Sequence, residues 1–188
     1  MSEIRERIIT IALSYVGQLE KQDNQGWEDS NFQSKMKGVK WWKGAAWCGF
    51  FQTLVWTEAY TTGNQIIGPA SQTIQSAWVD AKSIPSPVPG NEEKNAINLY
   101  KNKKLGGWAP VTKDQKSLGN IKPGDLVVFA SGHGEILIQT YKTQGKITSF
   151  DSVGGNSGEK VSYNKGLKLE GNKWYPAIKG FAQVIIPK

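Results

Sequence analysis

Apolar residues recur at helical spacing in two segments near the start of the chain. In the first segment they stand three or four residues apart: Ile4, Ile8, Ile11, Ala12 and Tyr15. This spacing predicts one buried face of a helix that begins after Ser2, a capping residue, and ends at Gly17. The second segment repeats the pattern with Phe51, Leu54, Val55 and Ala59. It predicts a helix from about Cys48 to Tyr60.

The helical pattern is interrupted in two places. Residues 18–44 are polar, with scattered aromatic residues, and we predict an ordered loop that leads up to Cys48. A further amphipathic stretch at about 74–81 predicts another helix. Residues 83–90 then contain prolines at a density that no helix or central strand tolerates. We therefore predict an insertion at about 84–119, with a short helix at about 91–102 inside it.

From Ile121 onwards the pattern changes to short apolar runs bounded by turns rich in Gly, Asn or Lys. These runs predict five strands: Asp125–Ala130, Glu135–Tyr141, Lys146–Val153, Lys160–Tyr163 and Ile178–Ile186. Closely spaced short strands are typical of an antiparallel sheet. Helices first and strands last indicate an α+β fold, with N-terminal helices packed on a C-terminal antiparallel sheet of about five strands. The 188 residues fit a single domain, residues 1–188.

The composition excludes several kinds of site. One Cys and one His are too few for an internal disulfide or a typical zinc centre, so we expect neither a metal nor another cofactor. The formal net charge of +7 suits a polyanionic partner such as nucleic acid, an anionic membrane surface or an anionic cell wall. No nucleic-acid-binding motif accompanies the charge, and no apolar run approaches the ~18 residues of a membrane span. The first residues do not form a secretion signal, so we expect synthesis in the cytoplasm and no membrane insertion.

Cys48 is the candidate nucleophile. It falls at the start of the second predicted helix, where unpaired backbone N–H groups and the helix dipole favour an anion. A helix N-terminus lowers the pKa of a thiol, and the thiolate is the form that attacks carbonyl carbons. A buried structural thiol is the alternative, because free Cys is among the most buried residue types.

His133 is the candidate base. It follows a Gly-containing turn and begins a predicted strand, where it can face a Cys at a helix start. The alternative is a surface or core histidine without a chemical role. Trp42 and Trp47 lie close to Cys48 in the sequence, and we expect them to line a substrate cleft, with core packing as the alternative.

Four motifs occur in an order that resembles the CHAP and NlpC-type peptidoglycan hydrolases, which are papain-like cysteine peptidases. They are Trp47-Cys48-Gly49-Phe50-Phe51, Lys122-Pro123-Gly124-Asp125-Leu126-Val127-Val128-Phe129, Gly132-His133 and Val153-Gly154-Gly155-Asn156-Ser157. The resemblance covers most of the chain except roughly residues 84–119. It implies a papain-like fold in which Cys48 attacks an amide of the wall peptide and His133 takes the thiol proton.

The resemblance also implies a third residue, on the strand after His133, that orients the imidazole. Related sequences often carry Glu-x-Asn there, whereas this chain has Gly154 in the place of the Glu and keeps Asn156. We expect Asn156 to hold the imidazole by accepting its N–H. Asp151 is the rival. In a straight strand it faces the side opposite to residues 152, 154 and 156, although a bulge would change that parity.

The activity that the resemblance implies is cleavage of an amide bond in bacterial peptidoglycan, either between sugar and peptide or within the peptide. We expect a phage lysin released by a holin, or an antibacterial effector that a secretion machine delivers and that has a cognate immunity protein. In both cases the protein acts at the cell wall, and we expect a monomer. A catalytically silent peptidoglycan-binding module is the alternative, although the presence of both Cys48 and His133 argues against it.

Overall fold

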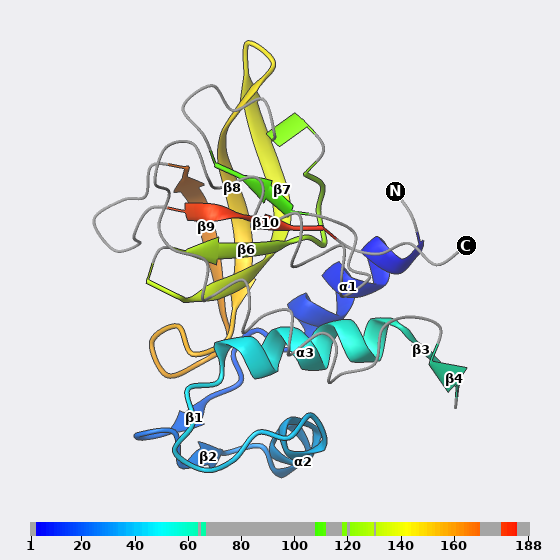
Figure 1. Ribbon diagram of the computed structural model, residues 1–188. Coiled ribbons are helices and arrows are strands. Elements are labelled where there is room, and N and C mark those ends of the chain that lie inside the picture. The colour runs from blue at the N-terminus through cyan, green and yellow to red at the C-terminus, as the bar shows by residue number, and fades with distance from the viewer. Residues whose placement is uncertain are drawn as a thin grey trace.

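Helices and strands form separate layers in this protein (Figure 1). The computed structural model describes residues 3–63, 65–66, 108–111, 118–119, 121–129, 131–169 and 178–183, with the backbone alone at 65–66, 108 and 110. Three helices lie in this part of the chain: α1 (Glu3–Ser14), α2 (Ser30–Gly38) and α3 (Cys48–Ala59). None of them is long and apolar enough to cross a membrane.

The main sheet has six strands: β5 (Trp108–Pro110), β6 (Leu126–Phe129), β7 (Gly134–Thr143), β8 (Lys146–Gly154), β9 (Ser162–Lys168) and β10 (Ile178–Ala182). Their order across the sheet is β5-β10-β6-β7-β8-β9, and every neighbouring pair is antiparallel. Two small ladders stand apart from it: β1 (Glu20–Lys21) with β2 (Gly26–Trp27), and β3 (Thr61–Thr62) with β4 (Gln65–Ile66). The predicted α+β fold, with helices packed on an antiparallel sheet, is confirmed.

The prediction of a loop over residues 18–44 is wrong, because this stretch contains β1, β2 and α2. Asp29 caps α2, and its side chain accepts the backbone N–H groups of Asn31 and Phe32. Only Phe32 and Met36 of the helix are buried. Two apolar residues in an otherwise polar stretch do not form a repeat long enough to predict an amphipathic helix.

The sheet extends into the range that was predicted as an insertion. Strand β5 pairs with β10, and the side chains of Ala109 and Leu118 are buried in the core. The last part of the range 84–119 is therefore integral to the sheet. The helices predicted at about 74–81 and 91–102 lie outside the described residues, as do the predicted cap Ser2 and the chain after residue 183. The predicted strand Lys160–Tyr163 begins later, as β9, because Lys160 forms only an isolated bridge with Leu19.

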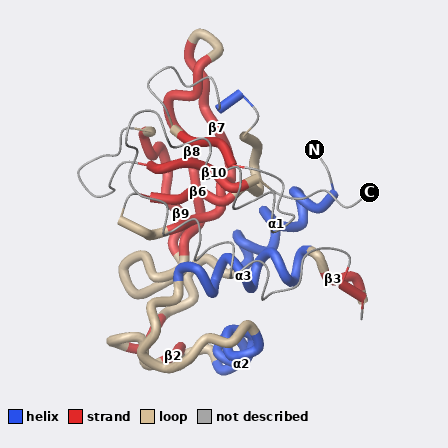
Figure 2. The backbone as a smooth tube through the Cα atoms, in the orientation of Figure 1, coloured by secondary structure: helices blue, strands red, loops and turns tan. Residues whose placement is uncertain are grey.

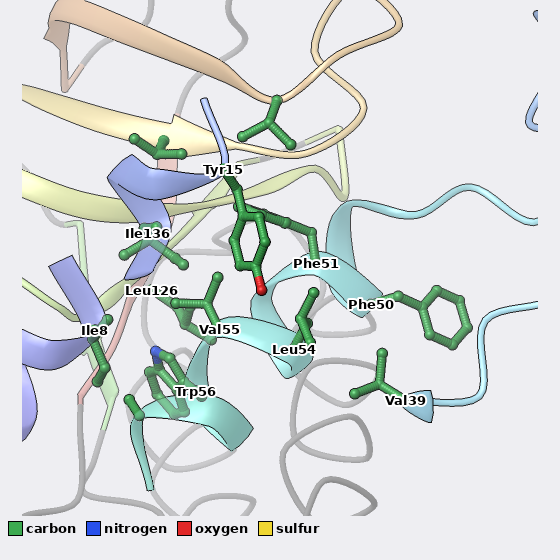
Figure 3. Packing of buried hydrophobic residues seen from close by; sticks show 14 of the residues in the cluster. Ile8, Tyr15, Val39, Phe50, Phe51, Leu54, Val55, Trp56, Leu126 and Ile136 are labelled. Carbon is green, nitrogen blue, oxygen red and sulfur yellow. The ribbon is translucent and has the colours of Figure 1, made fainter. Parts of the chain in front are cut away.

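Each face of the sheet carries its own apolar cluster. Alternation along β6 sends Leu126 and Val128 to the face that α1 and α3 cover, and Val127 and Phe129 to the other face. Figure 3 shows side chains of α1, α3, β6 and β7 meeting on the helix-covered face, including Val55 of α3. In Figure 2, α1 and α3 lie together below the sheet and α2 lies beyond α3. Because α3 is buried along most of its length, its first residue has a fixed position beside the sheet.

A buried ion pair joins α1 to the turn before β6. The Arg5 guanidinium donates to Asp125 Oδ1 at 2.7 Å and to the carbonyl of Pro123 at 2.8 Å. The other carboxylate oxygen accepts the backbone N–H of Lys122 at 2.8 Å. Gly124 occupies a left-handed conformation, φ +92°, that favours glycine. These contacts give the Lys122-Pro123-Gly124-Asp125 motif a structural role at the base of the sheet.

Candidate active site

Cys48 is the first residue of α3, and its thiol is half-buried. The preceding residue is held firmly. Trp47 is fully buried, packs edge-on against Trp27 at 5.1 Å between ring centroids, and donates its indole N–H to Glu20 Oε2 at 2.5 Å. The helix start is thus fixed by an aromatic cluster and by β1. The backbone N–H groups of Gly49 and Gly134 both favour the thiolate form of Cys48.

Trp47 is fully buried, so the expectation that it lines a substrate cleft is wrong. Its ring is part of the core, because it fills the space between α2 and α3 together with Trp27, Phe32 and Phe51. Trp42 differs, since 63% of it is exposed. Its ring meets Phe50 of α3 edge-on at a centroid distance of 5.3 Å. Of the two aromatic residues, only Trp42 offers a surface to a ligand.

The structure brings His133 close enough to Cys48 for the two side chains to interact electrostatically. His133 stands immediately before β7, after a tight turn in which the Phe129 N–H bonds to the His133 carbonyl at 2.9 Å and Gly132 has φ +82°. Its side chain is 21% exposed. The sequence therefore correctly placed this pair, one member at a helix start and the other at a strand start.

The two groups stabilise each other's charged forms. Burial raises the pKa of the Cys48 thiol, but the hydrogen bond and charge of His133, together with the two backbone N–H groups, outweigh burial and lower it. Burial likewise lowers the pKa of His133, but hydrogen bonds to Cys48 and Glu135 outweigh this and raise it to about 9. The arrangement favours a thiolate beside an imidazolium at neutral pH.

The partner of the imidazole is Glu135, which sequence reasoning missed. His133 Nε2 lies 3.2 Å from Glu135 Oε1, so Nδ1 is the ring nitrogen left for the thiol. The Glu135 side chain is fully buried. It also accepts a short hydrogen bond from the Ser152 hydroxyl, and the Asn164 amide donates to it at 2.9 Å. His133 and Glu135 stand two positions apart in the sequence, and in an extended chain this spacing puts both side chains on the same face. That spacing was the sequence signal for their contact.

Neither residue proposed as the third member contacts the imidazole among the described residues. Asn156 lies in the turn after β8 with φ +60°, and its side chain makes no hydrogen bond to His133. Asp151 is buried and accepts hydrogen bonds from Tyr141 at 2.9 Å and Tyr163 at 2.7 Å. The expected parity of β8 holds, because Ser152 faces Glu135 while Asp151 bonds elsewhere. The imidazole instead contacts Glu135, two residues further along the chain, with Nε2 3.2 Å from Oε1.

No family model, curated protein or solved structure matches the chain. Within the part of the chain that the structure describes, no group of three or more His, Cys, Asp or Glu side chains is placed to hold a metal ion. In this site a thiolate lies beside a protonated imidazole, which in turn contacts a buried carboxylate. In such an arrangement the thiolate can act as a nucleophile and the imidazolium can give its proton to a leaving group.

Proposed function

We propose that this protein is a cysteine hydrolase that cleaves an amide bond of bacterial peptidoglycan. The observation that carries the proposal is the juxtaposition of Cys48, the first residue of α3, with His133, which stands just before β7, close enough for each to shift the pKa of the other. The chain's single thiol and single imidazole are in contact, and the thiol pKa is lowered. A structural thiol has no need of this arrangement.

In the proposed reaction the Cys48 thiolate attacks the carbonyl carbon of the amide and forms a carbon–sulfur bond. The carbon–nitrogen bond then breaks, and the imidazolium of His133 gives its proton to the departing amine. A water molecule next attacks the thioester while His133 takes one of its protons. The acid is released and the thiolate is regenerated, so the enzyme returns to its starting state.

Two features support peptidoglycan as the substrate. The order of the motifs around Cys48, His133 and Gly154 resembles the CHAP and NlpC-type hydrolases, and the α+β architecture is compatible with their papain-like fold. The net charge of +7 suits an anionic cell wall. A phage lysin released by a holin and a secreted effector with a cognate immunity protein both fit these features.

Digestion of purified bacterial sacculi, followed by mass spectrometry of the released muropeptides, tests the proposal. The wild-type protein should release fragments with a new amine and a new carboxyl group at one bond type. Cys48→Ala and His133→Ala, checked for folding by thermal unfolding, should release none. If the wild-type protein binds sacculi without releasing fragments, the silent binding module is correct instead.

A further inference from the structure

Glu135 is a buried carboxylate whose donors come from two strands and from the turn before a third. His133 precedes β7, Ser152 belongs to β8 and Asn164 to β9, and all three donate to it. The register pairs Ser152 directly with Asn164, so both side chains emerge on the face of the sheet that carries Glu135. The strand pairing, rather than a flexible loop, fixes the position of this carboxylate.

The charge balance at Glu135 favours a protonated imidazole. A buried carboxylate is costly unless it is paired and hydrogen-bonded. Ser152 and Asn164 are neutral, so among the described residues in contact with it only His133 can supply a positive charge. The titratable groups in contact with His133 are Cys48 of α3 and Glu135 itself. The carboxylate therefore favours the imidazolium and, through it, the thiolate.

Gly154 leaves the space that Glu135 occupies. A Cβ added at Gly154 would lie 2.6 Å from Cγ and 2.7 Å from Cδ of Glu135, closer than real Cβ contacts allow. The backbone of Gly154 is not in the left-handed region, so conformation does not require glycine here. The lack of a side chain is explained by the carboxylate that reaches across from β7.

We propose that Glu135 is the positioning residue of the site: its carboxylate, held by Ser152 and Asn164 in the space above Gly154, fixes the ring of His133 and supports the thiolate–imidazolium pair. This inference rests on the proposed hydrolase function. A carboxylate in this place does not have to come from β7. Because the Gly154 Cβ direction points at the Glu135 carboxyl group, an acidic side chain at 154 can deliver a carboxylate to nearly the same position once Glu135 is shortened.

The first test compares Glu135→Gln and Glu135→Ala with the wild-type protein. Loss of an orienting group should lower kcat by about 10²-fold or more with little change in KM, because the group does not touch the substrate. The pH at which Cys48 becomes reactive towards iodoacetamide should also move upwards. Asp151→Asn is the matched control, since it removes a buried carboxylate of β8 that faces away, and its alkylation profile should match the wild type.

The second test moves the carboxylate to β8. Glu135→Ala/Gly154→Asp and Glu135→Ala/Gly154→Glu provide two side-chain lengths, and at least one should recover tenfold or more of the lost kcat and restore the alkylation profile. Gly154→Asp alone should be impaired, because two carboxylates then compete for one space. A wild-type alkylation profile in folded Glu135→Ala, or no recovery in either double variant, would overturn the proposal.

The alkylation measurement separates this inference from the proposed function. It needs no substrate, so it reports on the role of Glu135 even if sacculi are not cleaved. A wild-type protein that leaves sacculi intact but shows the expected shift in Glu135→Ala would refute the peptidoglycan substrate alone. Cleavage of sacculi with an unshifted Glu135→Ala profile would refute the positioning role alone.

Discussion

Cys48 and His133 each hold the other in its charged form, and this coupling should set the pH range of activity. The thiolate is lost as the pH falls through the lowered pKa of Cys48, and the imidazolium is lost as the pH rises through about 9. The leaving amine then lacks a proton donor. We expect a bell-shaped profile of kcat/KM whose two limbs belong to the coupled pair. Muropeptide release measured across the pH range checks this, and a single rising limb near 8.5, the value of a free thiol, would show an uncoupled Cys48.

At the residue scale the sequence indicated that Cys48 and His133 lie together, but not which side chain supports the imidazole. Cys48 and His133 could be predicted because each is the only residue of its type and each stands at the start of an element. The motif order predicts an orienting residue on β8 or just after it, whereas Glu135 lies on β7. The carboxylate comes instead from the strand that begins directly after His133, into space left by Gly154. Gly154, which stands where the resemblance leads one to expect an acid, indicated that another carboxylate fills that space.

At the element scale, the end of β8 packs on the start of α3, and Gly155 makes that approach possible. A Cβ at Gly155 would lie 2.5 Å from the Trp47 ring and 2.6 Å from Phe51 Cβ. Gly155→Ala should therefore lower the free energy of unfolding by about 1–3 kcal/mol and also reduce activity, because it displaces the helix start that carries Cys48. Urea unfolding measures the first effect. Gly38→Ala, where no atom lies within 4 Å of the added Cβ, is the control and should be near neutral.

The ion pair between α1 and the turn before β6 is a second link between elements. Both side chains are almost fully buried, at 8% exposure for Arg5 and 0% for Asp125. Asp125→Ala leaves a buried guanidinium without its carboxylate and should cost about 3–5 kcal/mol in the free energy of unfolding. Disruption of the half-exposed pair Lys35–Glu58 by Glu58→Gln should cost only about 1 kcal/mol. If Asp125→Ala and Glu58→Gln lower the free energy of unfolding equally in urea, the Arg5–Asp125 pair does not stabilise the fold as a buried ion pair.

Elements with a strong period were predictable, and those that depend on tertiary contacts were not. The helix α3 and strands β6 and β7 each carry a continuous apolar run or stripe that is visible in the sequence. The helix α2 buries only Phe32 and Met36, and β5 is a short edge strand that exists because β10 pairs with it. Trp47 was misjudged because position beside Cys48 along the chain does not reveal which way a ring points.

At the scale of the whole molecule, the excess of 23 basic over 16 acidic residues should draw the protein to an anionic wall. The inactive Cys48→Ala variant should co-sediment with purified sacculi at low salt and be released progressively as ionic strength shortens the range of electrostatic attraction. Sacculi stripped of anionic polymers provide the matched comparison and should retain less protein. Binding that is insensitive to both changes would contradict a role for net charge.

The α+β architecture could be predicted from the order of elements along the chain, helices first and strands last, because that order does not depend on exact element boundaries. The contact between the end of β8 and the start of α3 depends on packing between Trp47, Phe51 and Gly155, which the order of elements does not reveal. Short motifs could not indicate which side chain stands behind the imidazole, because that depends on strand register.

The pH dependence of Cys48 alkylation by iodoacetamide, in the wild-type protein and in His133→Ala, tests the assembled pair most directly. The chain has one cysteine, so the label reports on this thiol alone. We expect an inflection well below the free value of about 8.5 in the wild type and an upward shift in His133→Ala, because the imidazolium no longer supports the thiolate. An inflection near the free value that does not move when His133 is removed would contradict the proposed active site.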